Sequence, residues 1–177
     1  MIITVFPGQG AQTPGFLEPW LAVPGVRESL ERYSADSGVD LIAAGTEWDA
    51  DQIRDTQVAQ PLIVAASLVS YAALTDAAGA EPGGVAGHSV GEIAALVAAG
   101  VLNDDDGMRL VGLRGRAMAE AAAAAQTGMS AIIGGDRNAV LTRLGELDLT
   151  PANHNGAGQI VAAGTLDALA ALVESPV

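Results

Sequence analysis

Cysteine and lysine are absent from this 177-residue chain, and only 3% of its residues are aromatic. Without cysteine the chain offers no disulfide framework, no thiolate nucleophile and no cysteine-based metal site. Its eight basic residues are all arginine, and they are outnumbered by 21 acidic residues without forming any basic run. The formal net charge of −13 repels phosphate backbones, which disfavours a nucleic-acid partner. We expect neither a bound metal nor a bound nucleic acid.

The apolar half of the chain consists mostly of small and aliphatic side chains. Hydrophobic residues make up 50% of the sequence, which contains 35 alanines and 22 glycines. This content excludes a disordered chain and predicts a core packed by closely approaching backbones. The start of the chain lacks the positive charge of a signal peptide, and the longest apolar stretch, 62–74, is too short to span a bilayer. We therefore expect a cytoplasmic protein with no membrane partner.

A strand and a glycine-rich loop are predicted at the beginning of the chain. Residues 2–6 are apolar and mostly β-branched, which is typical of a buried strand, and the loop 7–15 follows them. Thr13 stands where a dinucleotide-binding fingerprint requires glycine or alanine, so a Rossmann site is disfavoured. The N–H groups of the loop suit an anionic or carbonyl oxygen. Further along, a helix is predicted from Pro61 to about Asp76, buried on most of its faces.

The strongest chemical signal is the G-x-S-x-G sequence at 87–91, which lies between a predicted strand at 84–86 and a predicted helix at 92–99. In this context the motif forms a sharp turn that lifts the serine hydroxyl above the sheet edge. The Val90 N–H and the helix dipole then point at the oxygen that becomes negative during acyl transfer. The alternative is a glycine-rich turn in which Ser89 only caps the helix.

Neither histidine provides a convincing base for this serine. His88 is adjacent to Ser89 on a tight turn, where neighbouring side chains point apart, whereas a base must reach hydrogen-bond distance. His154 lies in a loop segment, which is typical of an exposed histidine. The residues alone therefore identify no base.

A long helix with one unusual arginine is predicted after Asn103, which caps it. Three aspartates at 104–106 complement the helix dipole, and the helix extends to about Ala125. At about 100° per residue, Arg114 falls in the middle of a face of leucine, valine, alanine and methionine. A buried arginine needs a partner, so two alternatives stay open: an internal ion pair, for example with Glu92, or a carboxylate of the substrate.

The sequence pattern changes from Met129 onward. The predicted elements are strands at 130–133 and 159–163 and helices at 137–147 and 166–173. Thr165 is expected to cap the last helix. Together with one more strand, to which no range is assigned, these elements make the β-α-β-β-α order that is typical of a split β-α-β unit without its final strand. We therefore expect two domains, 1–126 and 127–177.

Five segments of the chain carry a family resemblance. They are P-G-Q-G-A-Q (7–12), T-Q-V-A-Q-P (56–61), G-H-S-V-G-E (87–92), L-R-G-R-A-M (113–118) and N-H-N-G-A-G-Q (153–159). In this order they resemble the malonyl-CoA:acyl carrier protein transacylases of the acyltransferase family, along the whole chain. The glutamine loop with the G-H-S-x-G-E turn is specific to acyltransferases. The arginine on the following helix narrows the resemblance to members that handle dicarboxylic acyl units.

The resemblance implies a fold, a reaction and its partners. The fold is an α/β-hydrolase-like core with an inserted ferredoxin-like subdomain, both truncated at the C-terminus. The reaction is malonyl transfer from malonyl-CoA to acyl carrier protein, in fatty-acid or polyketide synthesis, with no cofactor and no metal.

The resemblance also implies residue roles. Ser89 corresponds to the nucleophile, and Gln9 and Val90 correspond to the N–H donors of the oxyanion hole. Arg114 corresponds to the residue that pairs with the malonyl carboxylate. The other substrate-binding positions are Gln60, His88 and Asn155.

One group of the family pattern is missing, since the family's histidine base lies downstream of the subdomain, beyond Val177. The resemblance is therefore to an N-terminal portion of the family, and two other classes stay open: a serine esterase of α/β-hydrolase type, and a non-catalytic fragment or binding module. The net charge also opposes docking of an acidic carrier protein, unless arginines cluster locally.

Overall fold

The computed structural model describes residues 1–79 and 81–175, which form two compact units, Met1–Glu120 and Ala121–Val177. Each unit has its own hydrophobic core and contains both helices and strands, so the protein is a mixed α/β protein. The division falls in the last turns of helix α5 (Asp104–Ala123), slightly before the boundary between 126 and 127 expected from the sequence.

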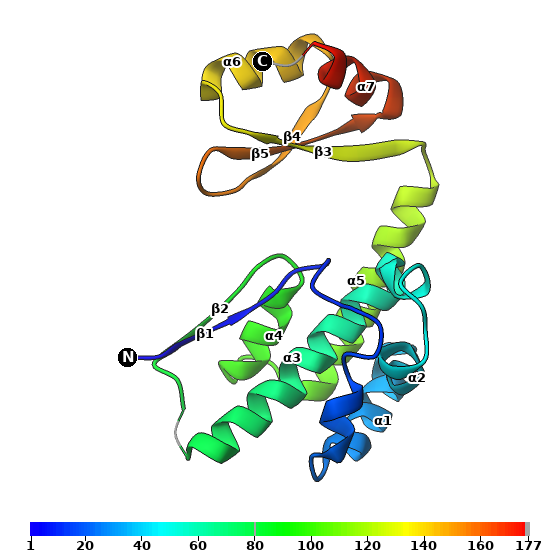
Figure 1. Ribbon diagram of the computed structural model, residues 1–177, viewed down its shortest axis with the longest axis vertical. Coiled ribbons are helices and arrows are strands. Elements are labelled where there is room, and N and C mark those ends of the chain that lie inside the picture. The colour runs from blue at the N-terminus through cyan, green and yellow to red at the C-terminus, as the bar shows by residue number, and fades with distance from the viewer. Residues whose placement is uncertain (80, 176–177) are drawn as a thin grey trace. The chain divides into compact units, whose positions relative to one another are not determined.

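The first unit combines a parallel pair of strands with helices (Figure 1). Its elements are β1 (Ile3–Phe6), α1 (Val26–Ser37), α2 (Leu41–Thr46), α3 (Thr56–Ala78), β2 (Gly84–Gly87), α4 (Gly91–Ala98) and α5, with 3₁₀ turns at Glu18–Ala22 and Gln52–Arg54. The register pairs Ile3 with Gly84 and Phe6 with Gly87. A parallel pair needs a long crossover, and α3 lies within that connection. The sequence pattern gave no prediction for α1 and α2.

Helix α3 begins at Thr56, so the prediction that it starts at Pro61 was wrong. Asp55 caps its first turn, because its side chain accepts a hydrogen bond from the Gln57 N–H at 2.9 Å. The proline is tolerated inside the helix, where its missing N–H removes a single backbone bond. The predicted burial is confirmed between Val58 and Val69, whereas the last third of the helix is exposed.

Helix α3 is also long and apolar enough, by length and composition only, to cross a membrane. Of its most apolar 18-residue window, 61% is buried inside the protein. A buried core helix meets the same criterion, so this is weak support for a membrane span.

Strand β1 is far less buried than its apolar sequence predicts. Only Phe6 is buried, against the Tyr71 ring at 5.7 Å between centroids, whereas Ile2 and Val5 are 73% and 72% exposed. Among the described residues β1 pairs with β2 alone. An open groove of about 450 Å³ lies between β1 and α3. The expectation of a buried strand was wrong because apolar composition does not say which neighbours cover a strand.

Glycines form the buried face of α5. The residues buried on it are Gly107, Met108, Val111, Gly112 and Gly115. A Cβ at position 112 would lie 2.4 Å from the Ser37 carbonyl oxygen, so α1 and α5 touch through their backbones. The leucine-rich face expected to be buried is instead largely exposed, with Leu113 at 59%. The hydropathy pattern predicted the wrong buried face because glycine has no apolar side chain and so adds nothing to such a pattern. Glycine nevertheless allows two helices to approach most closely.

Gly112→Ala should lower the free energy of unfolding of the first unit by about 1–3 kcal/mol, the usual cost of overpacking. The added methyl group would push the end of α1 away from α5. Gly145→Ala, on helix α6 (Arg137–Glu146) with nothing within 4 Å, is the matched control and should stabilise by up to about 1 kcal/mol through helix propensity. Urea unfolding followed by circular dichroism measures both. Equal changes in the free energy of unfolding for Gly112→Ala and Gly145→Ala would contradict the close contact between Gly112 and the end of α1.

Ionisable groups also join α1 to α5. The Tyr33 hydroxyl donates a hydrogen bond to Asp104, and Arg109 pairs with Asp36 at 2.8 Å. Burial, with the Asp104 hydrogen bond, raises the pKa of Tyr33 above its ordinary value, and the hydrogen bond from Arg109 lowers the pKa of Asp106. The Tyr33–Asp104 and Arg109–Asp36 contacts therefore join α1 to α5, whereas the Arg109–Asp106 pair lies within α5.

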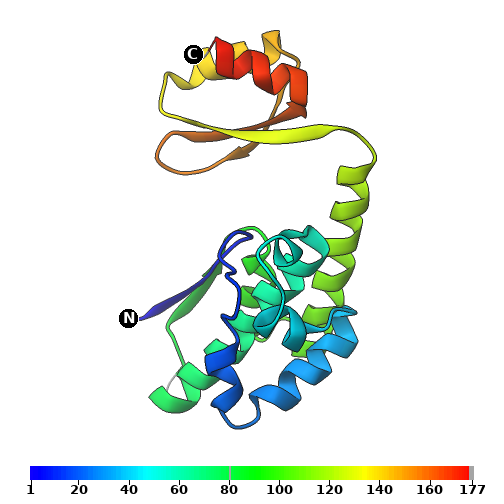
Figure 2. The same cartoon turned by 45° about the vertical axis from the view of Figure 1, so that its right-hand side comes forward.

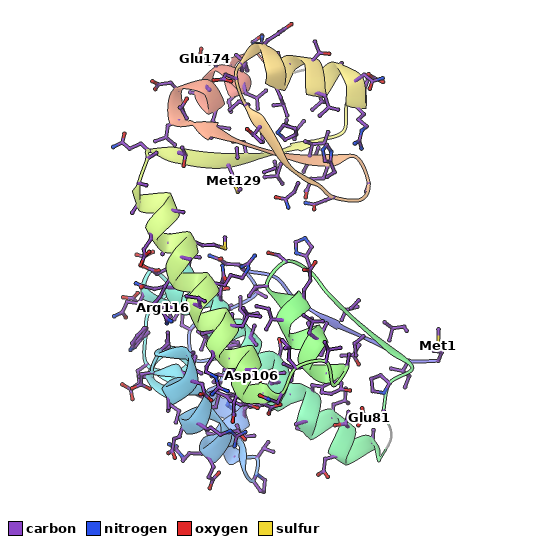
Figure 3. The ribbon with its side chains drawn as sticks, turned by 180° about the vertical axis from the view of Figure 1, so that it is seen from behind. Met1, Glu81, Asp106, Arg116, Met129 and Glu174 are labelled. Atoms are coloured by element: carbon purple, nitrogen blue, oxygen red, sulfur yellow. The ribbon has the colours of Figure 1, made fainter. Side chains whose placement is uncertain are left out.

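The second unit is a three-stranded antiparallel sheet with strand order β3-β5-β4 and two helices on one face (Figures 1 and 2). Its elements are β3 (Thr127–Ile133), α6, β4 (Thr150–His154), β5 (Gln159–Thr165) and α7 (Leu166–Glu174). The predicted β-α-β-β-α order is confirmed, and so is the Thr165 cap, which accepts from the Ala168 N–H at 3.2 Å. Met129 on β3 points away from the helices and is 65% exposed (Figure 3).

Candidate active site

Ser89 lies on a tight turn between β2 and α4, as the motif predicts. Hydrogen bonds from the Gly91 N–H to the His88 carbonyl at 3.0 Å and from the Glu92 N–H to the Ser89 carbonyl at 3.1 Å close this turn. Ser89 has a φ of +54°, which a residue with a side chain rarely adopts. Such strain persists where the surrounding structure enforces it, and it is frequent at functional sites. The turn holds Ser89 at the exposed surface of the first unit.

The two glycines of the motif are required by close backbone contacts. A Cβ on Gly87 would lie 2.2 Å from the Gly91 carbonyl oxygen. A Cβ on Gly91 would lie 2.4 Å from the Phe6 carbonyl oxygen, at the end of β1. No side chain fits at either position without moving backbone, so the glycines fix the turn against β1.

The glycine-rich loop after β1 is held against the same turn. The His88 N–H donates to the Phe6 carbonyl at 3.0 Å, and a Cβ on Gly8 would lie 2.8 Å from the His88 imidazole. On the other side of the loop, the Gln9 side chain donates to the Thr56 hydroxyl at 3.2 Å. The loop is therefore anchored between the start of α3 and the Ser89 turn. No local sequence pattern could have identified the Thr56 anchor, because it is far from the loop along the chain.

Two backbone N–H groups, one on the Ser89 turn and one in the loop held against it, are available to a ligand. Within the described residues, neither the Gln9 N–H nor the Val90 N–H donates a hydrogen bond. Val90 immediately precedes α4, whose N-terminal dipole end favours negative charge. Preoriented N–H donors of this kind can stabilise an oxyanion formed at a serine-bound acyl group.

Arg114 meets the side chain of Gln60, and the expected alternative of an ion pair with Glu92 was wrong. Arg114 Nη1 donates to Gln60 Oε1 at 2.6 Å, and Gln60 Nε2 contacts Met118 Sδ at 3.2 Å. Gln60 is only 1% exposed. In the described part of the chain no carboxylate lies within ion-pair distance of Arg114. The angular position of Arg114 on its own helix could not predict this partner, because Gln60 lies on another helix, α3.

The remaining predicted site residues divide between the two units. His88 is exposed and packs over Gly8, and its imidazole forms no hydrogen bond among the described residues. His154 is the last residue of strand β4, so its expected place in a loop was wrong, although it is exposed as expected. Asn155 closes the following hairpin, because its side-chain amide donates to the Gln159 side chain at 2.6 Å. The first unit thus holds Gln9, Gln60, His88, Ser89, Val90 and Arg114, and the second unit holds Asn155. Among the described residues no group of three or more His, Cys, Asp or Glu side chains could hold a metal ion.

Comparison with known proteins establishes the family. The model of the acyl transferase domain matches residues 3–176 of this chain. The chain belongs to the acyltransferase family. A malonyl CoA-acyl carrier protein transacylase from Mycobacterium tuberculosis is 51% identical to this acyltransferase over 99% of the chain. The chain spans 59% of the length of that relative.

Solved structures agree with this assignment. The crystal structure of the transacylase from Mycobacterium tuberculosis superposes with a TM-score of 0.91 at 51% identity, covering 99% of the acyltransferase chain and 59% of the solved one. A chain of a structure described as a type II polyketide-synthase acyl-carrier protein in complex with its malonyl-transacylase matches with a TM-score of 0.85 at 35% identity, over 95% of this chain and 56% of the solved chain. The resemblance read from the sequence motifs is confirmed, together with the mixed α/β fold.

Proposed function

We propose that this acyltransferase moves a malonyl group from coenzyme A to the phosphopantetheine thiol of an acyl carrier protein through an ester on Ser89. The observation that carries the proposal is the strained Ser89 turn, with an unbonded N–H on Val90 and another on Gln9 in the loop that packs against the turn. The transacylase identity of the relatives supports the substrate pair.

In the proposed reaction the Ser89 hydroxyl attacks the thioester carbonyl of malonyl-CoA and gives its proton to a base. The N–H groups of Gln9 and Val90 hold the resulting oxyanion, which collapses to the ester as the coenzyme A thiolate leaves and is protonated. The carrier-protein thiol then attacks the ester and regenerates serine. Neither His88 nor His154 corresponds to the family's histidine base, and the His88 imidazole forms no hydrogen bond among the described residues.

We also propose the substrate contacts implied by the family. Arg114 pairs with the free malonyl carboxylate, because a guanidinium binds a carboxylate through two parallel hydrogen bonds. The resemblance also assigns His88 and Asn155 to substrate binding, together with Gln60, which would act through its hydrogen bond with Arg114. In this proposal the first unit belongs to an α/β-hydrolase-like core and residues 127–177 to a ferredoxin-like subdomain, in a cytoplasmic enzyme of fatty-acid or polyketide synthesis that uses no cofactor.

The direct test is covalent labelling of the protein as its gene encodes it. Incubation with radiolabelled malonyl-CoA should place one malonyl group on the peptide that contains Ser89, detected by mass spectrometry. Addition of holo acyl carrier protein should then remove the label. Ser89→Ala should accept no label, since no other nucleophile is proposed. Labelling of Ser89→Ala, or release of the label as free malonate without transfer, would contradict the proposal, and the second outcome would indicate an esterase.

A further inference from the structure

Gln60 is a polar side chain at one of the most buried positions of α3. Its exposed fraction is 1%, and its immediate neighbours along the helix, Ala59 and Pro61, are buried as well. A buried amide costs free energy unless both of its ends find partners. Here Arg114 occupies the carbonyl end at 2.6 Å, and the Met118 thioether accepts from the amine end at 3.2 Å. Gln60 therefore has a defined place between α3 and α5.

The chemistry of the two partners fixes which way the amide faces. A guanidinium can only donate hydrogen bonds, and a thioether can only accept them weakly. The reversed amide would place its NH₂ group against the NH₂ group of Arg114 and leave the carbonyl against sulfur. Only the observed orientation satisfies both contacts, so the Gln60 carbonyl holds one nitrogen of Arg114 in place.

This contact restrains the guanidinium without neutralising it. Ion pairs with carboxylates hold Arg32, Arg54, Arg109 and Arg143 in the described chain. Arg114 is half-buried and meets a neutral carbonyl instead. Its other N–H groups donate no hydrogen bond within residues 1–79 and 81–175. A carboxylate that reaches Arg114 therefore meets a full positive charge and unused donors on a side chain that is already oriented.

We infer that Gln60 is a positioning residue that orients Arg114 for the carboxylate of a dicarboxylic acyl group, and that the neutrality of residue 60 keeps the charge of Arg114 available for that carboxylate. This inference rests on the proposed malonyl transfer through Ser89. According to this inference, the hydrogen bond between Gln60 on α3 and Arg114 on α5 helps to determine which acyl group is selected. Residue 60 acts through Arg114.

The test compares Gln60→Glu with Gln60→Met in the protein as its gene encodes it. Transfer to holo acyl carrier protein is measured from malonyl-CoA and from acetyl-CoA. Gln60→Glu keeps the size of the side chain but pairs internally with Arg114, so kcat/KM for malonyl should fall by about 100-fold while that for acetyl changes little. Gln60→Met removes the carbonyl that holds Arg114 but leaves the Arg114 charge unpaired. The KM for malonyl-CoA should therefore rise by about 10-fold, with kcat nearly unchanged.

Two controls separate positioning from folding. Gln57→Glu makes the same substitution at an exposed position of α3, one turn earlier, and should leave the malonyl-to-acetyl ratio unchanged. In an Arg114→Ala background, Gln60→Glu should change malonyl transfer by no more than about twofold, because residues that act through one another are not additive. Circular dichroism melting of each variant reports folding, and Gln60→Met keeps the inference testable if Gln60→Glu does not fold.

Several results would overturn the inference. One is a malonyl-to-acetyl ratio that stays within about threefold of wild type in both Gln60 variants, while wild-type Ser89 is labelled normally. Another is a parallel loss of acetyl and malonyl transfer, which indicates a purely structural role. Failure of the wild-type protein to accept malonyl on Ser89 is a different result, which overturns the proposed function and the inference together.

Discussion

Replacing Arg114 by alanine should reduce the preference for malonyl over acetyl by at least about 100-fold, because truncating one partner of a desolvated charge pair costs roughly 2–5 kcal/mol. The loss should fall on kcat/KM for malonyl-CoA. Acetyl transfer should be unchanged or slightly faster, since acetyl leaves the half-buried guanidinium of the wild-type protein unpaired. Competition between the two thioesters, with product identified on the carrier protein, measures the ratio directly.

Arg116→Ala is the matched control for this experiment. Arg116 lies two residues further along α5 (Figure 3), and its guanidinium donates to the Ser37 carbonyl at the end of α1, at 2.8 Å. Its loss should lower stability and leave the acyl preference unchanged. Arg114→Lys should recover only part of the preference, because an ammonium cannot reproduce two parallel hydrogen bonds. An unaltered malonyl-to-acetyl ratio in Arg114→Ala would mean that the arginine is structural.

A polypeptide of residues 1–177 alone should transfer malonyl at least about 100-fold more slowly than a chimera that continues it with the remaining part of the Mycobacterium tuberculosis transacylase. A positioned base contributes about 10²–10⁴ in rate. The family resemblance assigns the base to neither His88 nor His154, and the His88 imidazole forms no hydrogen bond among the described residues. The 51% identity and the TM-score of 0.91 make the junction compatible. Transfer rates of the two purified proteins, each with its Ser89→Ala counterpart, give the comparison.

The same pair of proteins should also differ in self-association. In residues 1–177, Val5 of β1 and Ile2 just before it are exposed, and an open groove lies between β1 and α3. Exposed apolar surface on an unpaired strand edge promotes association, so light scattering should detect oligomers of the short form. For the prediction of slow malonyl transfer, comparable turnover by residues 1–177 would be the contrary result, and it would show that His88, His154 or a second subunit supplies the base.

The sequence predicts the Ser89 turn well because most of the residues that build it are neighbours in the chain. The strand, the two glycines and the following helix lie within a few residues of one another, and each glycine answers a contact that a side chain would block. The same holds for the Asn103 and Thr165 caps, whose hydrogen bonds to Asp106 and Ala168 span three residues. Short-range geometry of this kind follows from residue type and spacing alone.

Features that depend on packing between distant segments could not be predicted in the same way. The partner of Arg114 is Gln60, on a helix distant in sequence, and hydropathy gives no information about that pairing. The buried face of α5 was misplaced because its contacts are made by Gly112 and Gly115, which carry no apolar side chain. The exposure of β1 likewise depends on which strands lie beside it.

The separation of the serine turn from the Gln60–Arg114 pair has a consequence for how such an enzyme can diverge. The turn is built from β2, α4 and the loop after β1, and its glycines accept no substitution without backbone movement. The arginine and the glutamine that orients it lie on α5 and α3, and they contact one another through their side chains. A lineage could therefore acquire a new acyl unit through changes on one helix pair while the nucleophile geometry is inherited intact, and a selectivity library confined to positions 60, 114 and 118 would follow the same route.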